Sequence, residues 1–168
     1  MNVTAGELVV DLGDVRALGR ELDRQFDAFR DMTGDIPTHL ESHQHVHRQL
    51  NIGRASSNLV TYPLRGFSEV SYIGIFYGQR EDGRTDLRHI SLGYLISVLN
   101  NVEPGFSELA CHPGTQGGDF DAVYNWQREI EVESLTDPRA KVAAARAEVQ
   151  LTNYRDYRSL LTPSTAMA

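Results

Sequence analysis

Segments with helical periodicity alternate with short apolar or β-branched segments along almost the whole chain of 168 residues. This alternation is typical of α/β proteins, in which helices connect parallel strands. We count about four candidate strands by the enrichment in apolar, aromatic and β-branched residues. They lie at 38–47, 64–78, 106–114 and 149–154. The expected class is α/β with a largely parallel sheet and flanking helices.

Local signals predict where several helices begin and end. Apolar residues recur every three or four positions between Asp14, which can cap a helix, and Gly34, which can close it. Ser91 can cap a further helix, and Asp137 followed by Pro138 is a strong helix start. Three further helical segments are predicted less distinctly, at 51–62, at about 124–135 and at 155–161.

The charge balance and the cysteine content restrict the environment and the partners. The chain has 16 Lys and Arg against 23 Asp and Glu, so its formal net charge is −7. A negative surface without a basic run argues against a nucleic-acid partner. The single cysteine, Cys111, cannot form an internal disulfide, and no stretch approaches the length of a membrane span. We therefore expect a cytoplasmic protein without membrane contact.

Four histidines lie within the ten residues of "THLESHQHVH" (38–47). In an extended strand His39, Glu41, His43, His45 and His47 would share one face. Imidazoles on a wet face can ligate a divalent metal, and His43 and His47 could both reach one pocket. The alternative is an exposed edge without a function.

A second motif is "ELACHPG" (108–114), which ends a predicted buried strand with a rigid Pro-Gly turn. His112 would then lie at the carboxyl end of a strand, where α/β sheets place their chemistry, and could act as a general acid or base. The alternative is that Cys111 and His112 only complete a core strand. Cys111 itself is expected to be a small buried hydrophobic residue.

Aromatic residues in "YIGIFYGQ" could form a wall against a sugar ring or could belong to the core. They are Tyr72, Phe76 and Tyr77, with Gln79 beside them. Trp126 allows the same two interpretations.

The two histidine motifs together resemble the YdjC-like carbohydrate deacetylases, the chitooligosaccharide deacetylase family. That family has the pattern Pro-Thr-His-hydrophobic-Asp-Ser-His-x-His-Val-His and, downstream, Cys-His-Pro-Gly. This chain contains "PTHLESHQHVH" and "CHPG", and the resemblance extends over about residues 14–158.

The resemblance implies an irregular α/β barrel and the removal of an acetyl group from an N-acetylated sugar with a divalent ion, Mg or Zn. Matched by position, His43 and His47 would be metal ligands and His112 would protonate the departing amine. Arg65 could orient substrate or a carboxylate, and we expect Arg65, His45 and Tyr77 to contact the substrate.

The chain departs from the family pattern in three places. We find no Asn-Ala-Asp-Asp-Phe-Gly motif and no second metal histidine in a His-Leu-Asn-type strand, and Glu41 replaces the usual Asp. The expected domain is therefore a partial (β/α) barrel at 1–160 that lacks roughly the first three strands, followed by a frayed tail at 161–168.

These departures leave alternatives to a working deacetylase. The chain could be a catalytically impaired half-domain that binds a sugar or serves as a partner subunit. Its partner would be a second copy, or a chain that supplies the N-terminal half. A histidine-rich metal-buffer module is the third alternative.

Overall fold

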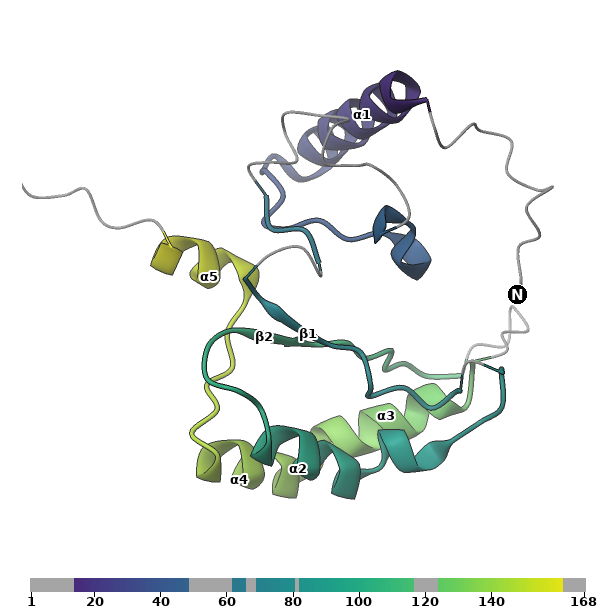
Figure 1. Ribbon diagram of the computed structural model, residues 1–168, viewed down its shortest axis with the longest axis vertical. Helices are drawn as coiled ribbons and strands as arrows, with labels where there is room; N and C mark the ends of the chain where they lie inside the picture. Colours follow the sequence, from purple (N-terminus) through teal and green to yellow (C-terminus); the bar gives the residue numbers. More distant parts are fainter. Residues whose placement is uncertain (1–13, 49–61, 66–68, 81, 117–123, 162–168) are drawn as a thin grey trace, which may run out of the picture. The chain divides into compact units, whose positions relative to one another are not determined.

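The computed structural model divides the chain into two compact units (Figure 1). Unit 1 comprises Met1–Ser68 and Asn153–Ala168, and unit 2 comprises Glu69–Thr152. The residues that the structure describes are 14–48, 62–65, 69–80, 82–116 and 124–161.

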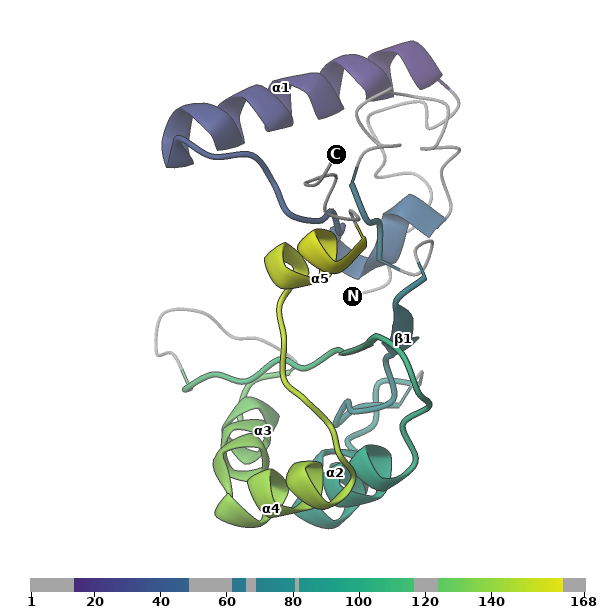
Figure 2. The same ribbon diagram turned by 90° about the vertical axis from the view of Figure 1, so that its left-hand side faces the viewer.

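Unit 1 begins with α1 (Val15–Thr33), a single unbroken helix in Figure 2. The Asp14 carboxylate accepts hydrogen bonds from the backbone N–H groups of Arg16 (3.1 Å) and Ala17 (2.9 Å). At the other end Gly34 adopts φ 68°, the left-handed conformation that favours glycine, and its N–H donates to the Arg30 carbonyl at 2.8 Å. Both predicted ends of this helix are confirmed.

The histidine-rich segment is not the predicted strand. Leu40 forms an isolated parallel bridge with Leu64, and the chain then turns into the 3-10 helix η1 (His43–Arg48). The hydroxyl of Ser42 accepts the backbone N–H of His47 at 3.0 Å, which folds the chain back on itself. The prediction of a strand at 38–47 is therefore wrong from Ser42 onward, because a serine side chain competes with strand pairing for backbone groups.

Unit 1 also contains the last helix, α5 (Tyr154–Leu161). The Asn153 side-chain oxygen accepts the N–H groups of Arg155 (2.9 Å) and Asp156 (3.0 Å). Residues 149–153 form no strand, so the predicted strand at 149–154 is wrong. The strand is absent because the Asn153 side chain caps α5, so the backbone after Asn153 is helical.

The sheet of unit 2 is small and parallel. Strand β1 (Ser71–Ile73) pairs with β2 (Ser107–Leu109), with Tyr72 opposite Glu108. Both lie inside predicted strands and are shorter than predicted. The class is α/β as expected, but the sheet in the described part of the chain has two strands rather than about four. The partial barrel therefore stays a prediction.

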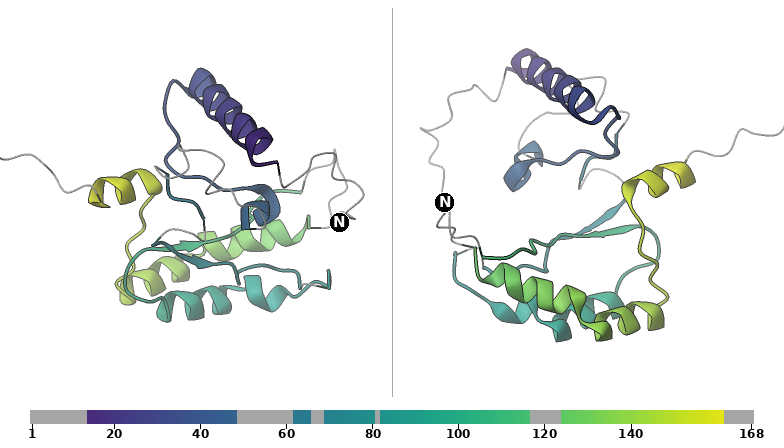
Figure 3. Two further views of the ribbon diagram at one scale, coloured as in Figure 1. Left: turned by 45° about the horizontal axis from the view of Figure 1, so that its top comes forward. Right: turned by 180° about the vertical axis from the view of Figure 1, so that it is seen from behind.

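Three helices of unit 2 lie together on one side of β1 and β2, as Figures 1 and 3 show. They are α2 (Leu92–Asn100), α3 (Gln127–Thr136) and α4 (Pro138–Arg146), and the short 3-10 helix η4 (Leu87–Ile90) precedes them. The predicted caps of α2 and α4 are confirmed: the side chains of Ser91 and Asp137 accept the N–H groups of Tyr94 and Arg139.

The core of unit 2 forms where these helices meet the loop after β1. Phe76 and Ile90 have no exposed surface, and Leu95 and Ala140 are also buried. Cys111 packs against this cluster, as expected of a small apolar residue. Phe76 therefore belongs to the core and not to a sugar-facing wall.

Two predictions lie outside the described residues: the helix at 51–62, apart from Tyr62, and the frayed tail at 161–168, apart from Leu161, which ends α5. In the described part of the chain, no helix is both long and apolar enough to cross a bilayer.

Candidate functional site

The histidines of the 38–47 segment have different environments. The ring of His39 stacks on Tyr154, with centroids 4.1 Å apart and planes inclined by 9°. His43 is exposed, His45 is half-buried with φ 55°, and His47 is buried, with 1% of its surface exposed. A 3-10 helix repeats about every three residues, so these side chains do not alternate between two faces as in a strand.

His47 uses both ring nitrogens inside unit 1. Its Nδ1 lies 2.6 Å from the Ser42 hydroxyl, and its Nε2 lies 2.8 Å from the carbonyl oxygen of Arg65. A carbonyl oxygen only accepts, so in the neutral imidazole Nε2 carries the proton and Nδ1 accepts from Ser42. A metal at His47 would have to replace one of these hydrogen bonds.

Arg65 contacts the histidine segment twice. Its guanidinium forms an ion pair with the carboxylate of Glu41, and its carbonyl oxygen accepts from His47. The side chain of Arg65 is 18% exposed and that of Glu41 is 48% exposed. The carboxylate that Arg65 orients in this structure is therefore that of Glu41, and its contact with a substrate stays a prediction.

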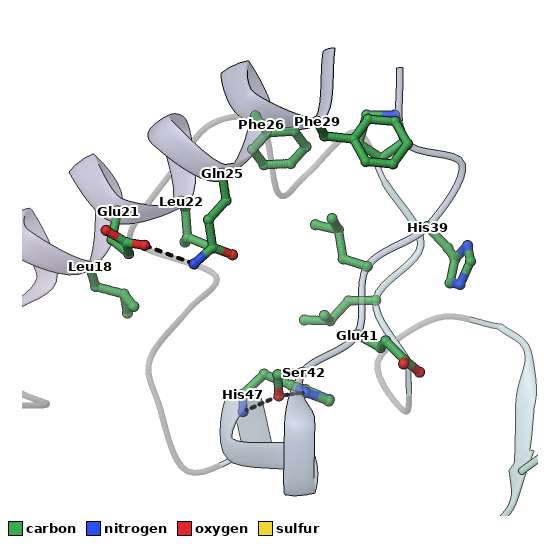
Figure 4. A pocket seen from close by; sticks show the side chains of 13 residues that line it. Leu18, Glu21, Leu22, Gln25, Phe26, Phe29, His39, Glu41, Ser42 and His47 are labelled. Carbon is green, nitrogen blue, oxygen red and sulfur yellow. Dashed lines mark hydrogen bonds between the residues drawn. The ribbon is translucent and has the colours of Figure 1, made fainter. Parts of the chain in front are cut away.

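A cavity of about 360 Å³ lies in unit 1 between α1 and the histidine segment (Figure 4). Leu18, Leu22 and Phe26 line it from α1. At the other side the lining becomes polar, where Ser42 and His47 are joined by their hydrogen bond. The histidine segment therefore borders a largely apolar hollow.

His112 lies in unit 2, three residues after the end of β2, and is exposed. Its backbone N–H donates to the carboxylate of Glu131 on α3 at 2.5 Å. The following turn runs close to the same helix, because the N–H of Gly114 donates to the Arg128 carbonyl at 3.3 Å. The Arg128 guanidinium also lies close to Gly114, where a Cβ atom would displace it.

Two tyrosines lie beside the imidazole of His112. The ring centroid of Tyr77 is 5.1 Å from that of His112, and the centroid of Tyr124 is 6.0 Å from it. The two phenol rings stack on each other at 4.5 Å. Burial raises the pKa of Tyr77 above its ordinary value. Tyr77 and His112, both predicted site residues, are thus neighbours.

Glu131 connects the parts of this cluster. It has no exposed surface, and besides the His112 N–H it accepts the hydroxyl of Tyr124. The Tyr124 oxygen in turn accepts the N–H of Gly78 at 3.0 Å. Burial, and next the hydrogen bond with Glu131, raise the pKa of Tyr124 well above its ordinary value. Both tyrosines therefore remain protonated at neutral pH.

Sequence reasoning missed Tyr124 and Glu131, although a signal for Glu131 was present. The three buried polar residues of α3 are Gln127, Glu131 and Ser134, at spacings of four and three. This spacing places them on one helix face. Polar residues at the spacing of a core-facing stripe indicate that this helix face is buried and hydrogen-bonded. They do not indicate a helix that is charged on exposed faces alone.

The structure brings the predicted site residues together in two groups, one in each unit. Unit 1 holds His43, His45, His47 and Arg65, and unit 2 holds Tyr77 and His112. Within the described ranges, no three His, Cys, Asp or Glu side chains are grouped so that they could hold a metal ion. The described residues alone therefore do not fit a divalent metal centre.

Comparison with protein families matches residues 4–146 to a family described as YdjC-like protein. The chain belongs to this family. The resemblance that the two histidine motifs indicate is thereby confirmed.

Curated relatives of this YdjC-like chain carry related names. A carbohydrate deacetylase from Geobacillus stearothermophilus is 31% identical over 88% of the chain and 61% of its own length. A chitooligosaccharide deacetylase from Serratia marcescens is 27% identical over 90% of the chain and 63% of its own length. The chain therefore spans about three-fifths of the length of these relatives.

A solved structure supports the fold. It is that of a candidate cellobiose-phosphate cleavage protein from Enterococcus faecalis V583, with a TM-score of 0.65 over 86% of the chain and 61% of the other protein. The two sequences are 23% identical over the match, so this similarity concerns the fold alone.

Proposed function

We propose that this YdjC-like chain takes part in the hydrolytic removal of an N-acetyl group from a carbohydrate. Family membership and the names of the relatives support the reaction. The observation that carries the proposal is the exposed imidazole of His112, which follows the carboxyl end of β2 and lies 5.1 Å from the ring of Tyr77. A strand end is where α/β sheets place reacting groups.

The proposed part of His112 is that of a general acid. In amide hydrolysis water adds its oxygen to the acetyl carbon, the C–N bond breaks, and acetate and an amine are the products. The nitrogen leaves readily only when it receives a proton, and a protonated imidazole can donate one near neutral pH. The proton of the attacking water would pass to solvent, and His112 would take up a proton from solvent after the amine has left.

Tyr77, Arg65 and His45 are the proposed substrate-binding residues. The ring of Tyr77 lies next to His112, so a sugar on it would be near the acid, and sugar rings pack well on aromatic faces. Arg65 and His45 belong to unit 1, where Arg65 already holds the Glu41 carboxylate. Their contact with the sugar is proposed because both residues match positions of the family pattern.

The family resemblance also implies a divalent metal, Mg or Zn, with His43 and His47 as ligands. His43 is exposed and available, whereas His47 would have to give up a hydrogen bond to Ser42 or to the Arg65 carbonyl. Further ligands would have to come from outside the described residues. The proposed chemical steps are therefore those of the chain's own residues.

The second candidate function is that of a binding or partner subunit without activity of its own. The occupied ring nitrogens of His47 favour it, because neither is available to a metal without the loss of a hydrogen bond. Its partner would be a second copy or a chain that resembles the N-terminal part of the relatives. The expected location is the cytoplasm in both cases.

Acetate release from an N-acetylated chitooligosaccharide, with Mg²⁺ or Zn²⁺ added, tests the proposed function. We expect release by the wild-type chain, and a loss of about 100-fold or more in kcat for His112→Ala, the usual contribution of a general acid. His89→Ala, which removes another histidine of unit 2, should retain the wild-type rate. Equal rates for the His112 variant and the wild type would refute the role of His112, and no release from any variant would favour the subunit function.

A further inference from the structure

We propose that Glu131 is a positioning residue: its carboxylate fixes the backbone of His112 and the ring of Tyr124 in one rigid arrangement. The inference rests on the proposed function only for the part that His112 plays in the reaction. Glu131 itself touches neither imidazole nor substrate in this arrangement, because its contact with His112 is to the backbone N–H.

The burial of Glu131 is the first argument. It lies on α3 with 0% of its surface exposed. A buried carboxylate costs free energy unless hydrogen bonds replace its water shell. Oε2 accepts the His112 N–H at 2.5 Å, and Oε1 accepts the Tyr124 hydroxyl. Hydrogen bonds to an ionised acceptor are shorter and stronger than neutral ones, so this carboxylate holds both donors firmly.

The path of the hydrogen bonds is the second argument. Gly78, in the loop after β1, donates to Tyr124, and Tyr124 donates to Glu131. Glu131 also accepts the backbone N–H of His112, which lies three residues after the end of β2. The loops beyond both parallel strands are thus tied to α3. A Cβ atom at Gly78 would lie 3.0 Å from the Tyr124 oxygen and 2.7 Å from Ile90, so only glycine leaves room for this path.

The neighbouring Glu129 provides an internal comparison. It is exposed and accepts the backbone N–H of Gln116 at 3.0 Å and the side-chain amide of Gln116 at 3.3 Å. Two carboxylates of α3 therefore hold the same loop, one buried at His112 and one exposed at Gln116. Since only Glu131 reaches His112, Glu129→Gln is the matched control for Glu131→Gln.

The first test is the backbone amide signal of His112 in a ¹H–¹⁵N spectrum of the full chain. A short hydrogen bond to a carboxylate moves an amide proton downfield, and the neutral amide of Glu131→Gln accepts more weakly. We expect an upfield shift and faster hydrogen exchange at His112 in Glu131→Gln, and an unchanged His112 signal in Glu129→Gln. An unmoved His112 signal in Glu131→Gln would overturn the proposal.

Tyr124→Phe keeps the test decisive if Glu131→Gln does not fold. This change removes one of the two donors from the carboxylate and leaves the ring in place. The remaining hydrogen bond to His112 should strengthen, so its amide proton should move further downfield. A His112 signal that does not respond to Tyr124→Phe would contradict the proposed link between the two residues.

Kinetics show whether the positioning serves the reaction. We expect Glu131→Gln to lower kcat about tenfold or more with little change in KM, and to have no further effect in the His112→Ala background. An equal loss in both backgrounds would mean that Glu131 acts independently of His112. If the wild-type chain releases no acetate, the proposed function fails, and the amide signals alone decide the positioning role.

Discussion

One serine hydroxyl determines the local structure of the histidine segment. The Ser42 oxygen accepts the His47 N–H at 3.0 Å and lies 2.6 Å from its Nδ1, so backbone and ring are both fixed by the same atom. His43, at the first position of η1, is exposed and keeps no such constraint. His43 and His47 are equivalent in the sequence pattern, but His47 is a buried structural residue and His43 is accessible.

The accessible residue His43 should dominate any metal binding by this chain. Isothermal calorimetry with Zn²⁺ or Mg²⁺ should show weaker binding than a complete centre gives, because the described residues offer no group of three ligands. His43→Ala should reduce the affinity about tenfold or more, since removal of one ligand from a small set is costly. His89→Ala is the control. Unchanged affinity in His43→Ala would exclude it as a ligand.

Helix ends were predictable because their signals are local. Asp14, Ser91 and Asp137 each cap the helix that follows them, as their side-chain chemistry predicts. The strands were not predictable in the same way, because a strand depends on a partner far away in sequence. Thus Ser71–Ile73 pairs with Ser107–Leu109, while the alternating pattern at 38–47 pairs within the described ranges at Leu40 alone.

In the candidate site, too, local motifs were predictable and contacts between distant residues were not. Sequence motifs predict His112 and Tyr77 as site residues, since each motif is a short run of residues, and the structure places the two rings 5.1 Å apart. They missed Glu131, whose role arises from the approach of α3 to the end of β2. A contact between residues 112 and 131 follows from tertiary packing, which no local pattern encodes.

The cap of α4 should make stability depend on pH. Asp137 accepts the N–H of Arg139 at 2.8 Å and pairs with its guanidinium at 2.7 Å, and these contacts lower its pKa to about 2. A carboxyl whose pKa is lower in the folded state stabilises the fold above its unfolded pKa near 3.8, and this contribution is lost as the pH falls toward 2.

Asp137→Asn tests this contribution, since asparagine can still cap but carries no charge. The thermal midpoint of the variant should lie up to a few degrees below that of the wild type at pH 6, because the ion pair with Arg139 is lost while the cap is kept. The difference should shrink between pH 4 and pH 2. Glu133→Gln, on the exposed side of α3, controls for the loss of a carboxylate. A constant difference over this pH range would contradict the assigned cause.

At the scale of the whole molecule, the chain returns to unit 1 after completing unit 2. Unit 1 takes in the C-terminal residues from Asn153 onward. Within unit 1, Tyr154 stacks on His39, Arg155 pairs with Asp35 at 2.8 Å, and Tyr157 is 4% exposed. The helix α5 therefore contributes a buried aromatic residue to a unit whose other part is Met1–Ser68.

A chain that ends after Thr152 should consequently lose stability in unit 1 alone. Amide hydrogen exchange between Asp35 and Leu40 should accelerate about tenfold or more, because local opening there no longer breaks the contacts of Asp35 and His39 with α5. Exchange in α2, α3 and α4 should stay slow, since these helices pack within unit 2. Arg155→Ala should have a much smaller effect, because its ion pair with Asp35 is exposed and such pairs contribute little. Equal acceleration in both units would mean that the units unfold together. Unchanged exchange between Asp35 and Leu40 would mean that α5 does not stabilise this part of unit 1.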